Sequence, residues 1–402
     1  MIIGIDCRML GPKQAGLGRY VEQLIKYLPE ADIENQYVLF LKKENWNLVV
    51  EYDEFEKVKY GQPRTGESGT IHLPKNFKKI LANIDWYSWR EQIKFKKIIK
   101  NEEIDLMHFP HWNVPFFYNN PFVVTIHDLI MYHYPRAEAT TLGPIKFWLK
   151  DKAHRILIRH AVKKAKHIIV TSEFTKNDIV DTLGAEIKNI SVIYQSPFIG
   201  EKKLETGNWK LVADKYGINK PFVLYVGSAY PHKNLEGLVE AWKIFNEKYS
   251  NDYQLVLAGR ENYFYKKLKS KISDPDGSVF GGTDQKSVII TGFVPDNDLS
   301  ILYQEASLYV FPSLYEGFGL PPLEAMAHDL PVVSSSRSCL PEVLGEAALY
   351  FDPENYEQMA EVIYQGLTDK DIRSELKQYG KENIERFSPS SLAIETLKIY
   401  NE

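Results

Sequence analysis

Short apolar runs alternate with longer amphipathic segments along the chain, and the alternation stops once and then restarts. This pattern is typical of strands that cross over through helices into parallel sheets. In the first half the runs expected to form strands are 2–6, 37–41, 106–109, 122–126, 167–171 and 191–194. In the second half they are 222–226, 254–258, 288–291, 308–311, 331–334 and 348–351. The sequence therefore predicts an α/β protein with two doubly wound, Rossmann-like domains.

The point at which the alternation stops separates the two predicted domains. Residues 1–198 are expected to form the first domain, the polar stretch 199–219 a linker, and residues 220–386 the second domain. Ligands bind doubly wound sheets at the carboxyl ends of the strands, so a cleft between the facing domains is the expected site. Two stretches rich in glycine and proline, 59–72 and 273–282, are expected to be loops.

The composition narrows the class of protein further. With 402 residues and a net charge of −4, the chain lacks the basic surplus of a dedicated nucleic-acid binder. Its two cysteines, Cys7 and Cys339, are too far apart for a disulfide framework or a zinc knuckle, which favours a reducing compartment. The first ten residues carry Asp6 and Arg8, unlike a secretory signal, and no apolar run reaches 18 residues. We expect a cytoplasmic enzyme.

A glycine-containing stretch, GPKQAGLGRY, follows the first predicted strand. Gly16 and Gly18 would let backbone N–H groups approach an anion near the positive end of the next helix. The stretch is not the dinucleotide-binding fingerprint, because Val21 occupies its sixth position instead of Gly or Ala. The alternative is that both glycines only form a turn.

Two further polar side chains follow predicted strands. His127 ends the run 122–126 and would lie at the carboxyl edge of the sheet, where it could hydrogen-bond a substrate hydroxyl or be a structural histidine. Lys233 follows the run 222–226 at a strand-to-helix turn, where it could supply a positive charge to a phosphate or be an ordinary surface lysine.

The stretch SLYEGFGLPPLE, residues 313–324, follows the run 308–311. Pro321 and Pro322 suit the first turn of a helix, which places Glu324 on that helix and Glu316 in the loop before it. A carboxylate can bridge two sugar hydroxyls, and a glycine-rich loop exposes backbone N–H groups to phosphate oxygens. The spacing of two glutamates alone is weak support, because it occurs often by chance.

Residues 75–100 and 146–166 combine many lysines and arginines with aromatic and aliphatic side chains. Both stretches are expected to be basic amphipathic helices. They either contact an anionic membrane surface or present a solvated face while packing on the core.

Taken in order, these motifs resemble the family 4 glycosyltransferases, which have the GT-B fold. The resemblance covers nearly the whole chain and includes the following segments: TIHDLIMYHYPRAEAT, VTSEFTKNDIV, FVLYVGSAYPHKNLEGLVEAW, ITGFVPDNDL and SLYEGFGLPPLEAMAHDLPVV. It is closest to bacterial members that build polysaccharides and lipid-linked glycans. It also implies that the last residues, 387–402, form a helix that packs back on the first domain.

The resemblance implies roles for individual residues. Glu316 and Glu324 match the two ends of the family's Glu-x7-Glu motif, so the first is expected to contact the donor sugar and the second the ribose. Lys233 matches the lysine that contacts phosphate, and His127 matches the active-site histidine that contacts the donor hexose.

The other implied contacts surround the donor. Backbone groups around the glycine-rich loop are expected at the diphosphate or sugar, namely Gly317, Phe318, Gly319 and Leu320. Gly16 and Gly18 are expected to close over the phosphates, and Phe293 and Val294 to lie at the nucleobase. Many relatives have an arginine where this chain has Ser228, and Arg260 is the candidate to replace it.

The implied activity is retaining transfer of a hexose from a nucleotide sugar to a glycan or lipid-linked acceptor. GDP-mannose is the first candidate donor, and UDP-glucose or another UDP-hexose is the second. No Asp-x-Asp follows a predicted strand, so Lys233, helix amides and Arg260 are expected to neutralise the leaving diphosphate without a metal or other cofactor. A sugar-nucleotide 2-epimerase and a non-catalytic partner subunit remain as alternatives.

Overall fold

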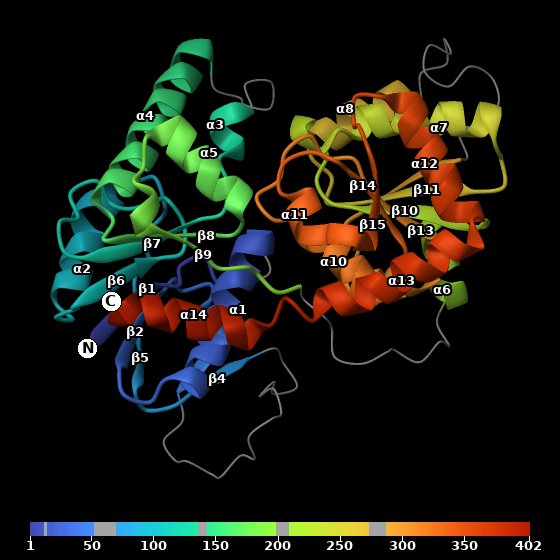
Figure 1. Cartoon of the computed structure of the whole chain (residues 1–402). Coiled ribbons are helices and arrows are strands. Elements are labelled where there is room, and N and C mark those ends of the chain that lie inside the picture. The colour runs from blue at the N-terminus through green and yellow to red at the C-terminus, as the bar shows by residue number, and fades with distance from the viewer. Residues whose placement is uncertain (12–13, 52–69, 136–142, 198–208, 273–286) are drawn as a thin grey trace. The chain divides into compact units, whose positions relative to one another are not determined.

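The computed structural model describes the chain except residues 12–13, 52–69, 136–142, 198–208 and 273–286. It divides into two compact units (Figure 1). The first unit combines Met1–Leu129, Leu142–Ser196 and Ser388–Glu402, and the second combines Ile130–Thr141 and Pro197–Phe387. The expected loop 273–282, most of the expected loop 59–72 and the first half of the expected linker 199–219 lie outside the described residues. The rest of that linker contains helix α6 (Trp209–Tyr216), in the second unit.

The first unit is built on a parallel sheet of seven strands in the order β5-β2-β1-β6-β7-β8-β9. The strands are β1 (Ile2–Asp6), β2 (Gln36–Leu41), β5 (Phe77–Leu81), β6 (Leu106–Phe109), β7 (Phe122–Ile126), β8 (His167–Val170) and β9 (Ile190–Val192). A separate parallel pair joins β3 (Val49–Glu51) to β4 (Ile71–Leu73). The helices are α1 (Ala15–Ala31), the π-helix η3 (Glu91–Phe95), α2 (Lys96–Lys100), α4 (Pro144–Lys164), α5 (Glu173–Leu183) and α14 (Pro389–Asn401).

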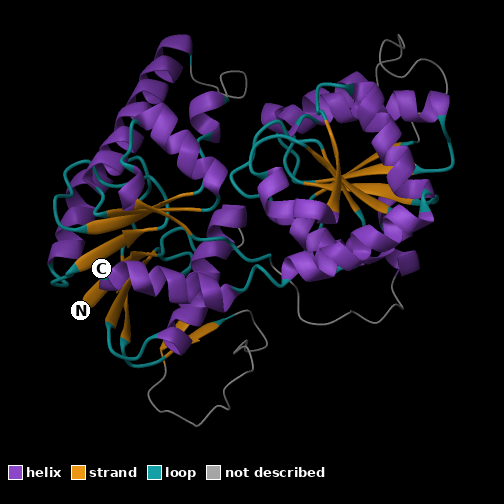
Figure 2. Ribbon diagram, viewed as in Figure 1, coloured by secondary structure: helices purple, strands orange, loops and turns teal. Residues whose placement is uncertain are grey.

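The second unit is built on a parallel sheet of six strands in the order β12-β11-β10-β13-β14-β15. The strands are β10 (Phe222–Val226), β11 (Gln254–Ala258), β12 (Val288–Gly292), β13 (Leu308–Phe311), β14 (Val332–Ser335) and β15 (Ala348–Phe351). The helices are α3 (Ile130–His133), α6, α7 (Leu235–Lys248), α8 (Tyr263–Ile272), α9 (Asp296–Glu305), α10 (Leu320–Ala327), α11 (Leu340–Leu344), α12 (Tyr356–Thr368) and α13 (Lys370–Ile384). In Figure 2 helices surround the strands of each sheet, so the predicted α/β class with two doubly wound domains is confirmed.

The C-terminal helix α14 belongs to the core of the first unit. It lies along α1 (Figure 1), and its Leu392 and Tyr400 are buried together with side chains of α1 and β1. Its start is fixed by Ser388, whose hydroxyl oxygen accepts a hydrogen bond from the N–H of Ser391, and by Pro389 in the first turn. The Tyr400 hydroxyl also hydrogen-bonds Nδ1 of His108 at 2.6 Å. The last residues of the chain therefore stabilise the domain that the first residues begin.

The expectation that residues 75–100 form one amphipathic helix is wrong. Phe77–Leu81 is strand β5, which pairs with β2 at the edge of the sheet, and helical structure begins only near Glu91. Phe77 is buried and stacks on Tyr37, with ring centroids 4.4 Å apart, whereas Lys78 and Lys79, which follow it in β5, are exposed or half-buried. Lysines at an edge strand are common, because they discourage pairing with other chains. The second basic stretch, 146–166, is helical, as expected, in α4.

Candidate active site

The loop between β13 and α10 in the second unit carries the two predicted glutamates. Glu316 lies in this loop, and Glu324 lies on α10, as the sequence predicted. Helix α10 begins after Gly319, whose φ of +94° favours glycine, and a Cβ there would lie 2.9 Å from Leu340 Cδ2. Prolines occupy the first turn of α10. Both glutamates are only 6% exposed.

Lys233 and Glu316 form an ion pair across two neighbouring strands of the sheet. Lys233 ends the short helix η7 (Pro231–Lys233), which follows β10, whereas Glu316 follows the adjacent strand β13. Lys233 Nζ lies 2.5 Å from Glu316 Oε1 and 5.5 Å from the centroid of the Phe311 ring. The side chains are 17% and 8% exposed, so both charges are largely desolvated. The Lys233 ammonium group, held in this position, is suited to binding a diphosphate.

The backbone of the loop that carries Glu316 is held by two residues that follow β14, Ser338 and Cys339. The Glu316 N–H donates to Ser338 Oγ at 3.0 Å, and Cys339 Sγ donates to the Glu316 carbonyl oxygen at 3.3 Å. Burial, and then the charges of Glu316 and Glu342, raise the pKa of Cys339, so this cysteine is a neutral packing residue. Its contact with the glutamate loop could not be read from sequence.

Glu324 is held separately from Glu316. Its Oε2 accepts a hydrogen bond from the Tyr303 hydroxyl at 3.2 Å, and its carbonyl oxygen accepts one from His328 Nδ1 at 2.8 Å. The Tyr303 and His328 rings stack with centroids 5.2 Å apart. A carboxylate accepts hydrogen bonds through both of its oxygens, so its chemistry suits ligand hydroxyls.

The glycine-rich loop offers its backbone and not its aromatic ring. Phe318 is 4% exposed and its ring packs edge-on against Phe387, with centroids 5.4 Å apart. Gly317 and Gly319 flank it, and Leu320 begins α10. The ring is therefore a core side chain that anchors the loop.

The remaining donor-binding residues predicted in the second unit follow the strands β10, β11 and β12: Ser228 follows β10, Arg260 follows β11, and Phe293 and Val294 follow β12. Gly259 contacts Gly227 so closely that a Cβ on it would lie 1.9 Å from the Gly227 carbonyl oxygen. Next to these glycines, the carbonyl oxygen of Ser228 accepts a hydrogen bond from the Tyr225 hydroxyl at 2.9 Å.

Arg260 and Phe293 form a pair at the same edge. Arg260 is exposed, and its Cζ atom lies 5.3 Å from the centroid of the Phe293 ring. Phe293 is 61% exposed, whereas the next residue, Val294, is buried. The exposed phenyl ring and the guanidinium provide a flat surface at the place where the resemblance puts a nucleobase.

In the first unit, Gly16 and Gly18 lie within the first turn of α1 and not before the helix. A Cβ at Gly18 would lie 2.1 Å from the Gly11 carbonyl oxygen, so this glycine permits a close backbone approach. Gly16 is exposed, and the side chain of the N-cap residue, Gln14, makes no capping hydrogen bond to the helix. The first-turn N–H groups of α1 thus suit an anion.

His127 follows β7, as predicted, and both of its ring nitrogens are engaged within the first unit. Nε2 donates to the Pro110 carbonyl oxygen at 2.9 Å, and Nδ1 accepts from Gln195 Nε2 at 2.8 Å. The Tyr20 ring packs edge-on at 4.7 Å. Burial lowers the pKa of His127 to about 4, although the hydrogen bond to Pro110 acts in the opposite direction. The imidazole is therefore neutral at pH 7.

Arg8, Asp6 and Glu91 form a buried ion cluster at the carboxyl end of β1, and the sequence did not predict it as a candidate site. Arg8, 1% exposed, donates to Asp6 and to Glu91, which is fully buried. In the sequence Asp6 and Arg8 are two charges within an apolar stretch, and Glu91 lies 83 residues away from Arg8. Only the folded chain brings them together.

Two general features of the described residues bear on the site. No group of three or more His, Cys, Asp or Glu side chains is arranged as a metal site within the described ranges. Among the same residues, no helix combines the length and the apolar character needed to cross a bilayer.

Comparison with protein families identifies the class of protein that carries this site. A model described as Glycosyltransferase Family 4 matches residues 15–195, and one described as Glycosyl transferases group 1 matches residues 212–383. The two matches cover every strand of the two large sheets except β1, and they include His127, Lys233, Glu316 and Glu324. The chain belongs to the family 4 glycosyltransferases.

Individual relatives agree with this assignment. O-antigen chain mannosyltransferase RfbU of Salmonella typhimurium is 27% identical over 358 residues, 87% of each chain. O-antigen chain mannosyltransferase B of Escherichia coli is 29% identical over 282 residues, 69% of each chain. The structure of sucrose-phosphate synthase from Thermosynechococcus elongatus matches with a TM-score of 0.69 and 19% identity, covering 100% of this chain and 98% of that one. The expected GT-B fold is confirmed.

We predict that the first unit loses stability as the pH falls from 6.5 towards 4. Burial lowers the pKa values of His108 and His111 to about 3 and that of His127 to about 4, below the ordinary 6.5 of an unfolded chain. The unfolded state therefore binds protons first, so the contribution of these neutral histidines is complete above pH 6.5 and is lost below it. His127→Gln should reduce the loss between pH 7 and pH 5 by about 2 kcal/mol. Urea unfolding at both pH values measures this, and an unchanged pH dependence would contradict it.

Proposed function

We propose that this protein transfers a hexose from a nucleotide sugar to a glycan or lipid-linked acceptor in the synthesis of a cell-surface polysaccharide. The Lys233–Glu316 ion pair carries the proposal, because it places a cation for the diphosphate beside a carboxylate for the sugar. The names of the relatives, O-antigen mannosyltransferases, favour GDP-mannose as the donor. UDP-glucose or another UDP-hexose is the second candidate.

The leaving group is stabilised by charge that the protein provides. Cleavage of the bond between the anomeric carbon and the diphosphate leaves negative charge on phosphate oxygens. Lys233 and the N–H groups of the glycine-rich loop and of the α10 first turn can take up that charge in a desolvated setting. Arg260 adds a second cation in place of the arginine replaced by Ser228. The transfer is proposed to need no metal.

Retention of anomeric configuration follows from attack on the face that the diphosphate leaves. The acceptor oxygen bonds to the anomeric carbon as the bond to the phosphate oxygen breaks, and the departing phosphate takes the acceptor proton. Glu316 is a poor covalent nucleophile, because its carboxylate is paired with Lys233 at 2.5 Å. Its proposed role is to hold hydroxyls of the donor sugar.

The other residues are proposed to bind the donor along its length. Glu324 would accept the ribose hydroxyls, and Phe293 with Val294 would lie at the base. From the first unit, Gly16 and Gly18 are assigned to the phosphates and His127 to the donor hexose. Because the two His127 nitrogens are engaged by Pro110 and Gln195, contact with a sugar requires one of these hydrogen bonds to be exchanged.

We also propose that the protein acts in the cytoplasm at the inner face of the membrane. Around helices η3 and α4, the exposed fractions are 82% for Trp89, 69% for Ile93, 51% for Phe117 and 55% for Ile156. The two regions are joined, since Gln92 accepts a hydrogen bond from the Phe116 N–H at 2.6 Å and the Phe116 ring packs on His160. Exposed basic residues lie on η3, α2 and α4 as well, namely Lys94, Lys97, Arg159, Lys163 and Lys164. Exposed apolar and basic side chains on the same helices suit an anionic membrane surface.

We predict that GDP and GDP-mannose raise the thermal unfolding midpoint without added metal, more than UDP, ADP and their hexose conjugates. A ligand present at a hundred times its dissociation constant stabilises the protein by about 2.7 kcal/mol. Lys233→Met should abolish the shift, because the diphosphate loses its cation. A shift only with UDP compounds would move the donor to the second candidate, and a shift only with added Mg²⁺ would contradict metal independence. No shift with any nucleotide would favour a non-catalytic subunit.

We predict that Glu316→Ala lowers the rate of transfer by a factor of about 10² or more. The substitution also leaves Lys233 unpaired and should cost about 1–3 kcal/mol of stability. Adding Lys233→Met should restore stability but not activity, which separates catalysis from folding. Glu346→Ala, at an exposed glutamate of the same unit, is the control. An unchanged transfer rate in Glu316→Ala would refute the assignment.

We predict that the protein co-sediments with vesicles containing anionic lipid and not with neutral vesicles. Lys94→Glu with Lys97→Glu should weaken the association, because attraction of each lysine to the surface contributes about 1 kcal/mol. Lys370→Glu with Lys377→Glu, at exposed lysines of α13, changes the net charge equally and is the control. Association that persists after the first pair of substitutions would contradict the membrane proposal.

A further inference from the structure

Tyr87 has a strained backbone and an exposed side chain. Its φ of +60° lies in the left-handed region, which a bulky residue rarely adopts. Its side chain is not buried in the core, since the residue is 54% exposed. Strain of this kind persists only where surrounding structure enforces it, and it concentrates at ligand-binding places.

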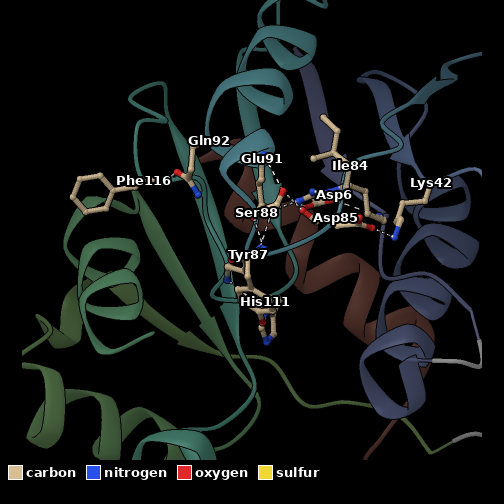
Figure 3. Close-up of polar contacts among 12 residues, drawn as sticks. Asp6, Lys42, Ile84, Asp85, Tyr87, Ser88, Glu91, Gln92, His111 and Phe116 are labelled. Atoms are coloured by element: carbon tan, nitrogen blue, oxygen red, sulfur yellow. Dashed lines mark hydrogen bonds and ion pairs between the residues drawn. The ribbon is translucent and has the colours of Figure 1, made fainter. Parts of the chain in front are cut away.

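Glu91, which belongs to the buried ion cluster, holds the Tyr87 backbone (Figure 3). The Tyr87 N–H donates to Glu91 Oε2 at 2.8 Å, and Glu91 Oε1 accepts from Arg8 Nη2 at 2.6 Å. Asn113 Nδ2 donates to the same oxygen at 2.8 Å, and Arg8 Nε and Nη2 donate to Asp6 at 2.8 and 2.7 Å. The end of β1, the helix η3 and the loop after β6 are therefore tied at one point.

The Tyr87 ring faces the aromatic loop after β6. The centroids of the Tyr87 and Trp112 rings lie 5.5 Å apart at an angle of 36°. Trp112 packs in turn on His111 at 4.6 Å and on His154 of α4 at 4.4 Å. In Figure 3 the Phe116 ring points away from Tyr87. Burial lowers the pKa values of His111 and His154, so the rings behind Trp112 are neutral.

This aromatic surface lies close to the predicted catalytic histidine. Pro110, whose carbonyl oxygen accepts the hydrogen bond of His127, directly precedes His111 and Trp112. A neutral, rigid pair of aromatic rings fits the apolar C–H face of a pyranose, while the ring hydroxyls of the sugar remain hydrated. The buried charges of Arg8, Asp6 and Glu91 pair with one another in the interior, so they support the platform and do not contact the ligand.

We propose that Tyr87 and Trp112 form a platform that binds a sugar ring of the acceptor, and that the Arg8–Asp6–Glu91 cluster positions it. The inference rests on the proposed glycosyl transfer for the identity of the ligand as acceptor. The platform itself is a property of the first unit. Its residues are separate from Lys233, Glu316 and Glu324, which are proposed to bind the donor.

The test measures binding of the purified full chain to an array of mono- to tetrasaccharides with mannose, galactose, glucose, rhamnose and N-acetylglucosamine termini. Wild-type protein should bind at least one glycan, and Tyr87→Ala and Trp112→Ala should each weaken that binding at least tenfold. Tyr87→Phe keeps the ring, and Tyr379→Ala removes an exposed aromatic ring of α13, to which no binding role is assigned. Both controls should stay within twofold of wild type.

The experiment separates this inference from the donor assignment. Thermal stabilisation by GDP or UDP, measured on the same preparations, should be equal in wild type and in Tyr87→Ala. Unaltered glycan binding in both Tyr87→Ala and Trp112→Ala would overturn the platform, and so would the absence of glycan binding by wild type. Failure of every nucleotide to stabilise wild type would overturn the proposed transfer, while loss of glycan binding in the variants would still support the platform.

Discussion

All strand pairs described in the two large sheets are parallel, and this constraint places the site. In a parallel sheet the carboxyl ends of all strands lie at one edge, so the loops that follow them are brought together. Lys233 and Glu316, 83 residues apart, meet because β10 and β13 are neighbours. In the first unit the same rule brings the ends of β1, β6 and β7 together, with Arg8, Trp112 and His127 in the loops that follow.

The protein buries charge in two different ways. Lys233 and Glu316 form a pair that keeps limited access to solvent, so polar groups of a ligand can reach both members. Arg8 is enclosed by Asp6, Glu91 and the Phe95 ring, 3.8 Å from its Cζ atom. Burial alone would lower the pKa of Arg8, but the charges and hydrogen bonds of Asp6 and Glu91 raise it above its ordinary value. Such a cluster is costly to desolvate, and here it fixes a strained backbone segment.

Patterns in the sequence predicted the strands that are buried on both faces, because such strands are continuous apolar runs. β6, β7, β10, β11 and β13 have the predicted ends. The pattern failed at the edge strand β5, because its sequence, with two adjacent lysines between Phe77 and Ile80, lacks the alternation typical of a strand. Strand β5 forms because the free edge of β2 offers hydrogen bonds to it, and that edge exists only in the folded sheet.

The sequence by itself determined the two doubly wound sheets, the positions of Glu316, Glu324, Lys233 and His127 after their strands, and the family to which the chain belongs. These properties depend on local periodicity and on motifs that are contiguous in the chain. Only the tertiary structure decided that Lys233 pairs with Glu316, that Gln195 and Pro110 engage His127, and that Glu91 holds Tyr87. The first two contacts join residues that are far apart in the sequence and that no periodicity relates. Tyr87 and Glu91 are only four residues apart, but Glu91 is itself held by Arg8, 83 residues away. Burial then sets the charge of each group, because desolvation is a property of the packed molecule and not of the chain.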